Sequence, residues 1–293
     1  MKIISREASN TFPQTELWTV QPDSIDHSFL LYITRPEFSI PDEKLPCILV
    51  FDGNSTAGTV VNLAQNLGLP PSILVSIGYP LNSAMPPVLA RNQDLTFSHW
   101  PAWDVTYGRV HNHVGPPSGQ ADRFLAFLTE ELKPEIQRHF NTDPAEWTVA
   151  GHSHGGLFVT YALLTSPSLF KRYLAVGSAF WWNGSTVFDL VGEFNSSEEE
   201  LDVSVYLAAG DGETQSRLAE SMIELMKTDV GREYFEVMGT MPDIVEDTRR
   251  MADLISRRKG TKVVFHILDG ESHGSALFAA YSRGLRWLSA AKD

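Results

Sequence analysis

The sequence predicts an α/β fold: a mostly parallel sheet with helices on both faces and an antiparallel hairpin at the N-terminal edge. Short continuous apolar runs, typical of strands buried on both faces, alternate with helical patterns. This alternation favours right-handed crossovers between parallel strands. Residues 15–35 instead alternate apolar and polar positions around the turn Gln21-Pro22-Asp23-Ser24, which predicts the hairpin.

The predicted elements follow in order along the chain. Buried strands are expected at 45–51, 72–78, 147–150, 173–177, 203–209 and 262–268. Helices are expected at 56–67, 121–140, 154–164, 216–227, 242–259 and 274–291. The chain has no internal repeat and no low-complexity linker, so we expect a single domain over residues 1–293.

Two segments have no clear period. Residues 79–118 carry prolines at 80, 86, 87, 101, 116 and 117, and we expect a long loop there. Its aromatic residues argue against disorder and favour a substrate loop. Residues 228–241 are a candidate cap element.

Composition limits the possible partners. The net charge of −13 argues against nucleic acid or an anionic membrane surface. No apolar run is long enough to span a bilayer, and the first residues lack the apolar core of a signal peptide. The single cysteine, Cys47, lies in an apolar run and is expected to pack as a small hydrophobic residue. We therefore expect a soluble cytoplasmic protein, with no cofactor and no metal, that acts on a small molecule.

The most informative stretch is Gly151-His152-Ser153-His154-Gly155, between an apolar strand pattern and a helical pattern. This is the G-x-S-x-G nucleophile elbow in its expected context, which predicts Ser153 as a nucleophile on a sharp strand-to-helix turn. The glycines leave room for the turn, and the helix N-terminus favours developing negative charge. The alternative is a glycine-rich turn with a serine N-cap.

A serine nucleophile needs a base and an acid that orients it. In α/β-hydrolases these partners follow the serine, on loops after later strands. His273 lies between the last predicted strand and the last helix, so we expect it to be the base. For the acid we favour Glu213 over Asp211; Glu246, Asp247 or a serine–histidine pair without an acid remain alternatives.

The oxyanion of an acyl-transfer intermediate needs two converging N–H donors. We expect one from the backbone of His154, directly after the nucleophile. The second is expected from Gly53 or Asn54, with Asn54 favoured, after the strand 45–51. The alternative is that Asp52-Gly53-Asn54 is only a turn.

Several motifs together resemble the esterase D-like family of α/β-hydrolases. They are Phe51-Asp52-Gly53-Asn54, the segment 73–80, Arg91-Asn92-Gln93-Asp94-Leu95-Thr96, the elbow 151–158, Phe180-Trp181-Trp182 and Gly270-Glu271-Ser272-His273-Gly274. The chain looks most like the siderophore (enterobactin-type) esterase branch, over about residues 15–290. The resemblance implies that Ser153 and His273 are catalytic and that Arg91 faces the substrate. Two departures are His154, where relatives have a short apolar residue, and Phe97, where proline is common.

These observations predict a serine hydrolase that cleaves an ester, lactone or thioester through an acyl-enzyme. The aromatic residues Trp100, Trp103 and Trp182, together with Arg91, are expected to form the wall for a fairly bulky substrate. The alternative is that the aromatics anchor the loop to the core. An acyltransferase with the same acyl-enzyme, or a silent binding module, is the alternative function.

Overall fold

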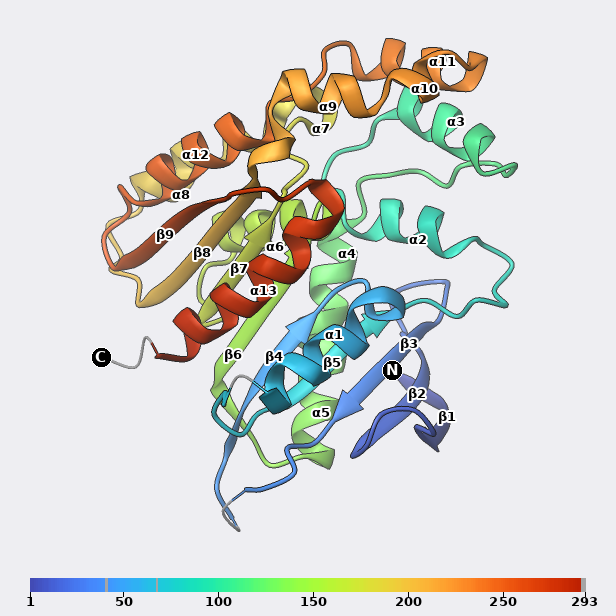
Figure 1. Ribbon diagram of the computed structural model, residues 1–293. Helices are drawn as coiled ribbons and strands as arrows, with labels where there is room; N and C mark the ends of the chain where they lie inside the picture. Colours follow the sequence, from blue (N-terminus) through green and yellow to red (C-terminus); the bar gives the residue numbers. More distant parts are fainter. Residues whose placement is uncertain (40–41, 67, 291–293) are drawn as a thin grey trace.

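The computed structural model describes residues 1–39, 42–66 and 68–290. Among them, one sheet of nine strands has the order β1-β2-β3-β5-β4-β6-β7-β8-β9 (Figure 1). The strands are β1 Lys2–Ala8, β2 Thr15–Gln21, β3 Phe29–Thr34, β4 Leu45–Val50, β5 Ile73–Gly78, β6 Thr142–His152, β7 Arg172–Val176, β8 Val203–Gly210 and β9 Thr261–Leu268.

The sheet confirms the predicted mixture of parallel and antiparallel strands. All pairs from β5 through β4 to β9 are parallel, whereas β1, β2 and β3 pair antiparallel, and β3 joins β5 antiparallel. The hairpin of β2 and β3 was predicted, but the edge strand β1 was not. Because β1 is largely exposed, it has neither the continuous apolar run of the parallel strands nor the clear alternation of the hairpin.

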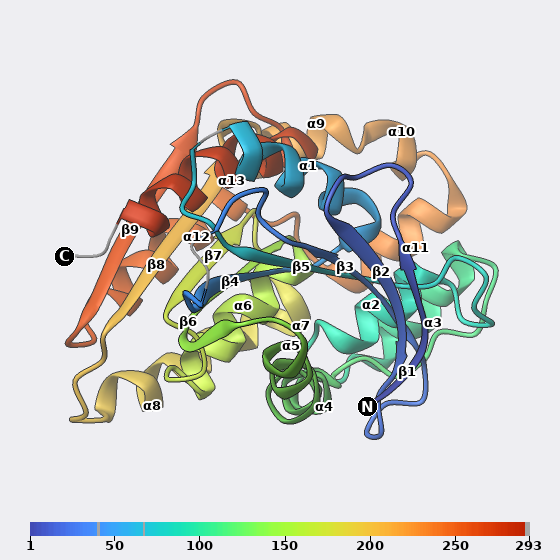
Figure 2. The ribbon, with the colours of Figure 1, turned by 90° about the horizontal axis from the view of Figure 1, so that it is seen from below.

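Helices cover both faces of the sheet (Figure 2). One face is covered by α1 (Gly53–Asn66) and α13 (His273–Ala290), whose apolar residues pack on alternate positions of β4 to β9. The other face carries the larger core and the remaining core helices. These are α4 (Ala121–Ala126), the π-helical η1 (Phe127–Leu132), α5 (Lys133–His139), α6 (His154–Thr165), α8 (Val191–Ser196) and α12 (Ile244–Ile255).

The segment 79–118 is not the long loop that we expected. It contains two helices, α2 (Pro87–Asp94) and α3 (Pro101–Val110). Each helix begins at a proline, and proline is well suited to the first helical turn because the N–H it lacks has no partner there. Pro87 and Pro101 therefore begin helices, although a proline-rich stretch without a period is more typical of a loop.

The candidate cap at 228–241 is also helical. It contains α11 (Asp229–Met238), which follows η3 (Asp211–Glu213), α9 (Gln215–Ser221) and α10 (Ile223–Met226). Tyr234 of α11 packs on Trp103 of α3 with ring centroids 4.7 Å apart, and Arg109 pairs with Glu233 at 2.8 Å. We call α2, α3 and α9–α11 the roof, because they lie beyond the carboxyl ends of β4–β9 (Figure 1). The short α7 (Trp182–Ser185) and 3₁₀-helical η2 (Thr186–Leu190) follow β7.

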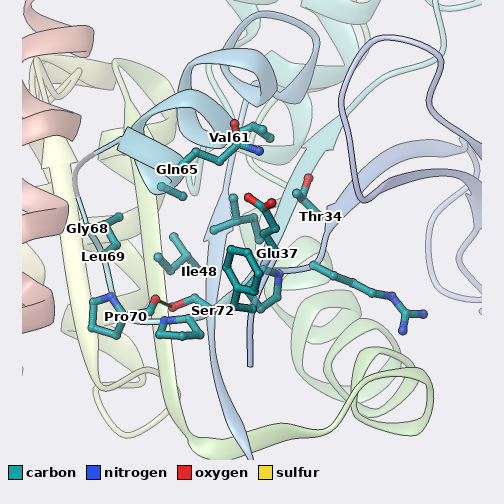
Figure 3. A pocket seen from close by; sticks show the side chains of 15 residues that line it. Thr34, Glu37, Ile48, Val61, Gln65, Gly68, Leu69, Pro70 and Ser72 are labelled. Carbon is teal, nitrogen blue, oxygen red and sulfur yellow. Dashed lines mark hydrogen bonds between the residues drawn. The ribbon is translucent and has the colours of Figure 1, made fainter. Parts of the chain in front are cut away.

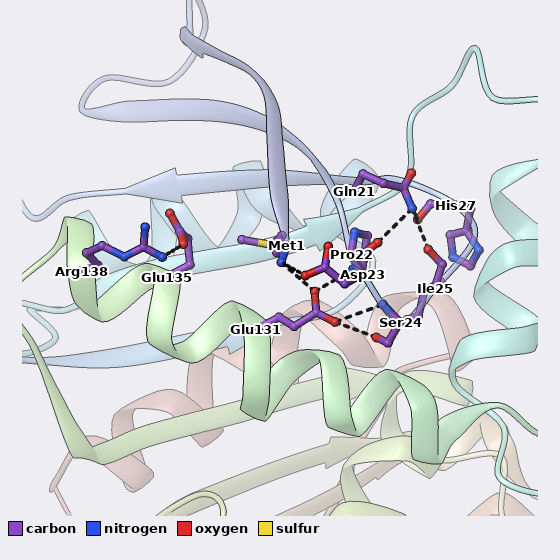
Figure 4. A network of polar contacts seen from close by, with 10 residues as sticks. All are labelled: Met1, Gln21, Pro22, Asp23, Ser24, Ile25, His27, Glu131, Glu135 and Arg138. Carbon is purple, nitrogen blue, oxygen red and sulfur yellow. Dashed lines mark hydrogen bonds and ion pairs between the residues drawn. The ribbon is translucent and has the colours of Figure 1, made fainter.

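A polar network attaches the N-terminal hairpin to the helix beneath it (Figure 4). The amino group of Met1 pairs with Asp23 at 2.7 Å and with Glu131 of η1 at 3.0 Å. Glu131 also accepts hydrogen bonds from the backbone N–H of Asp23 and from the hydroxyl of Ser24. The turn between β2 and β3 is thereby held against η1, on the side of the sheet away from α1.

Within the described residues, no helix is long and apolar enough to cross a membrane.

Candidate active site

The elbow at Ser153 joins β6 to α6 and has the strained backbone expected of this turn. Ser153 has φ 59° and ψ −118°, a conformation that is uncommon for a residue with a side chain. A Cβ atom on Gly151 would lie 2.3 Å from the carbonyl of Gly155, so the turn closes only with glycine at this position. The serine therefore stands half-buried at the carboxyl end of a central strand.

The structure brings His273 and Glu213 together, from the ends of β9 and β8. The Nδ1–H of His273 donates to Oε1 of Glu213 at 2.5 Å, because a carboxylate can only accept. The second oxygen of Glu213 accepts the backbone N–H of Gly210 at 2.6 Å, and the side chain is fully buried. Asp211 instead pairs with Arg217 at 2.6 Å and makes no bond to His273.

Gly177, at the end of β7, is the common neighbour of the serine turn and the histidine. The backbone N–H of Ser153 donates to Val176, and its carbonyl accepts from Ala179, so the turn is held on both sides of Gly177. A Cβ atom on Gly177 would lie 2.7 Å from Glu213 Oε1 and 3.3 Å from His273 Nδ1. Ser153 Oγ itself forms no hydrogen bond within the described part of the chain, a common situation in free enzymes.

Two helix N-termini lie side by side next to Ser153. Helix α1 follows β4 and helix α6 follows the neighbouring strand β6. The backbone N–H groups of His154 and Asn54 lie in the first turns of these helices, and neither has a hydrogen-bond acceptor in the described chain. The side chain of Asn54 exchanges two hydrogen bonds with the backbone of Tyr79, so only its backbone is left to bind a ligand.

Arg91 of α2 connects these two helix starts. It makes a bidentate pair with Asp52, with one contact of 2.9 Å, and donates to the carbonyl of His152 at 3.1 Å and to Nδ1 of His154 at 3.3 Å. Burial opposes its charge, but the Asp52 carboxylate more than compensates and raises the pKa of Arg91 above its ordinary value. Most of its donors are thus used within the protein, so Arg91 holds the two helix starts together. A contact of Arg91 with the substrate remains a prediction.

His154 is buried between Arg91 and the rings of Trp103, Trp181 and Trp182. Burial, followed by the positive charge of Arg91, lowers the pKa of its imidazole well below the ordinary value, so the ring is neutral. Because its Nδ1 accepts from Arg91, its Nε2 carries the hydrogen, and this atom has no partner among the described residues.

The tryptophans near the site divide into two classes by their exposure. Trp103 and Trp182 are 1% and 0% exposed, and their indole N–H groups donate to Asn92 and to the carbonyl of Ser98. The expectation that both contact a substrate is therefore wrong for this arrangement, because no surface of either ring is open. Trp100 and Trp181 are half-buried and pack on the same cluster, so these two can contact a ligand.

His152 is the residue that the sequence interpretation missed. It is not among the expected site residues, yet its ring lies 4.5 Å from that of His273. Its place next to the nucleophile was the only sequence signal, and that signal could not show the contact.

A cavity of about 280 Å³ lies outside this site (Figure 3). It is lined by the amino ends of β4 and β5, the last turns of α1 and the segment after β3, including Ile48, Leu74, Val61 and Phe38. Because Ser153 lies at the carboxyl ends of the parallel strands, the two are at opposite ends of the sheet. Within the described ranges, no three Asp, Glu, His or Cys side chains gather as metal ligands would.

Comparison with known proteins identifies the family. The family model described as "Putative esterase" matches residues 23–239. The chain is 28% identical over 286 residues to the ferri-bacillibactin esterase BesA of Bacillus subtilis, covering 94% of this chain and 90% of that protein. It is 27% identical to the siderophore triacetylfusarinine C esterase of Aspergillus fumigatus, covering 82% and 80% of the two chains.

Solved structures show the same fold. The BES protein from Bacillus cereus superimposes with a TM-score of 0.73 at 24% identity, over 97% of this chain and 99% of that one. The siderophore hydrolase EstB from Aspergillus nidulans gives a TM-score of 0.72 at 23% identity, over 96% and 97%. The similarity to the siderophore-esterase branch is therefore confirmed. The chain belongs to this esterase family and is a carboxylic ester hydrolase with the α/β-hydrolase fold.

Proposed function

We propose that this protein hydrolyses ester bonds of a siderophore-type substrate through an acyl-enzyme on Ser153. The observation that carries the proposal is the pairing of His273 with the buried Glu213 beside a strained serine turn. Such a pairing has a direct use in ester cleavage, because it fixes the imidazole tautomer whose free nitrogen can accept the serine proton.

The steps follow from these positions. Nε2 of His273 takes the hydroxyl proton as Ser153 Oγ attacks the ester carbonyl carbon. The backbone N–H groups of His154 and Asn54 stabilise the negative oxygen of the tetrahedral intermediate. The protonated His273 then gives its proton to the oxygen of the leaving alcohol. The alcohol departs, and the acyl group stays bound to Ser153. In the second half of the reaction, His273 takes a proton from water as the water oxygen attacks the acyl carbon. It then returns this proton to Ser153 Oγ as the acid leaves.

The substrate class rests on the relatives and on two partly open aromatic side chains near the site. The two curated relatives named above are esterases of ferri-bacillibactin and of triacetylfusarinine C. In this chain, Trp100 and Trp181 contact each other and present partly open aromatic surfaces, and the ring of Trp181 lies 6.1 Å from that of His154. Flat aromatic surfaces suit a large substrate with several ester bonds better than a short acetyl ester.

The proposal is tested by hydrolysis of two iron-bound siderophores, bacillibactin and triacetylfusarinine C, with p-nitrophenyl acetate as the small ester. We expect kcat/KM for at least one siderophore to exceed that for the acetate, with stepwise ester cleavage seen by mass spectrometry. Ser153→Ala should lower each rate by about 10³-fold or more. Ser196→Ala, which changes a serine at the end of α8, is the matched control and should leave the rates unchanged.

The two parts of the proposal can fail separately. If the acetate is cleaved and both siderophores stay intact, the substrate class is wrong. If the Ser153→Ala variant keeps its rate on every ester, the assignment of the nucleophile is wrong.

A further inference from the structure

The residue before the nucleophile contacts the backbone of the proposed base. Nε2–H of His152 donates to the carbonyl oxygen of His273 at 2.8 Å. His273 is the first residue of α13, so this bond reaches the point where the loop after β9 becomes a helix. A carbonyl oxygen has two lone pairs, so it can accept from His152 as well as from its own helix.

Contacts on other sides restrict the same loop. The carbonyl of Glu271 accepts the backbone N–H of Gly212 at 3.0 Å, which ties the loop to η3. Glu213 of η3 holds the Nδ1 side of the His273 ring. Gly177, at φ 50°, lies so close to Glu213 and His152 that no side chain fits there. The bond from His152 completes this set by fixing the backbone to which the ring is attached.

We propose that His152 is a positioning residue: its Nε2–H holds the carbonyl of His273 and so sets the place of the base beside Ser153. The inference rests on the proposed function, because it takes His273 to be the base. Since His152 and Ser153 are adjacent on one turn, the bond makes the nucleophile and the base share a single rigid support. General-base catalysis is sensitive to such distances.

His152 suits this task because it keeps one protonation state. Burial, followed by the charges of His273 and Arg91, lowers the pKa of His152 to about 3. The ring is therefore neutral at neutral pH, and its donor nitrogen is fixed by the carbonyl acceptor. A neutral neighbour also adds no charge that would oppose protonation of His273 during the reaction.

The test compares two replacements. His152→Leu keeps a similar volume and loses the donor, whereas His152→Gln can place an amide N–H near the position of Nε2. Active sites are first counted by titration with a fluorophosphonate, so that a loss of folded protein does not count as a loss of rate. We expect kcat per titrated site to fall about 10- to 100-fold in His152→Leu, with KM changed by less than about twofold. His152→Gln should recover most of this loss.

His139→Leu is the matched control. His139 also makes a side-chain hydrogen bond and a ring contact, but it lies on α5 at the amino ends of the strands. It should leave the rate per titrated site unchanged. A His152→Leu variant with the wild-type rate per site would overturn the proposal.

A double mutant separates this inference from the proposed function. If His152 acts through His273, adding His152→Leu to His273→Ala should lower the residual rate no further. An additional tenfold loss would show that His152 acts independently and would overturn the inference. A His273→Ala variant that keeps the wild-type rate would instead refute the proposed function, and with it the premise of the inference.

Discussion

At the scale of single residues, the choice between two nearby carboxylates depends on their partners. Glu213 is fully buried and directed at His273, whereas Asp211 is partly exposed and paired with Arg217. The chain order predicted that an acid would follow β8. The sequence favoured Glu213 but left Asp211 open, because the 3₁₀ turn that carries both residues decides which one faces the histidine.

Glu213→Gln should therefore lower kcat by about 10²- to 10⁴-fold, because an amide does not hold the required tautomer or stabilise the imidazolium. Asp211→Asn should change kcat by less than about threefold, because it loses only a partly exposed ion pair. Steady-state kinetics on an activated aryl ester measure both. A larger loss in Asp211→Asn would reverse the assignment, and no loss in either would leave a serine–histidine pair.

The two histidines beside Ser153 predict how stability depends on pH. The folded-state pKa values of both are depressed, chiefly by burial, and that of His152 is about 3. The unfolded chain takes up a proton at each near pH 6.5, whereas the folded chain does not. Stability from these groups is thus present above about pH 6.5 and is lost as the pH falls below it.

We expect the free energy of unfolding to fall between pH 7 and pH 5, with each histidine contributing a slope of at most about 1.4 kcal/mol per pH unit. Urea denaturation at a series of pH values gives the slope. His152→Gln should flatten it, because glutamine takes up no proton in the unfolded chain. The same slope in His152→Gln and wild type would contradict the prediction.

At the scale of elements, strands buried on both faces were predictable and the roof was not. Continuous apolar runs mark β4, β5, β7 and β8 clearly. Helices α2 and α3 carry polar residues toward each other and toward the elbow, as in the contact of Trp103 with Asn92, so they lack a simple apolar stripe. Their existence depends on tertiary contacts that a single sequence does not display.

The different burial of Trp103 and Trp181 separates effects on stability from effects on substrate binding. Trp103→Ala should lower the free energy of unfolding by about 3–5 kcal/mol, because it opens a large cavity between α3 and α11. Trp181→Ala removes a half-buried ring, so it should cost much less stability and should raise KM for siderophores more than for p-nitrophenyl acetate. Urea denaturation and steady-state kinetics distinguish the two. The opposite division of effects would show that Trp181 supports the fold and that the substrate lies elsewhere.

At the scale of the whole molecule, the order of the strands explains the position of the site. The parallel strands β4, β6, β7, β8 and β9 are neighbours, so their carboxyl ends lie at the same end of the sheet. The residues that follow these strands therefore come together there: Asn54, Ser153, Gly177, Glu213 and His273. Parallel pairing could be predicted from the strand–helix alternation. The contacts of Arg91 and His152 could not, because they join segments about 60 and 120 residues apart in the chain.

The central claim is that Ser153 carries the acyl group during ester cleavage. Rapid quenching during turnover of a slowly hydrolysed p-nitrophenyl ester, followed by peptide mass spectrometry, tests it most directly. We predict an acyl adduct on the peptide that contains Ser153, formed with a burst of p-nitrophenol equal to the number of active sites. An adduct on another residue, or a burst that persists in Ser153→Ala, would contradict the account.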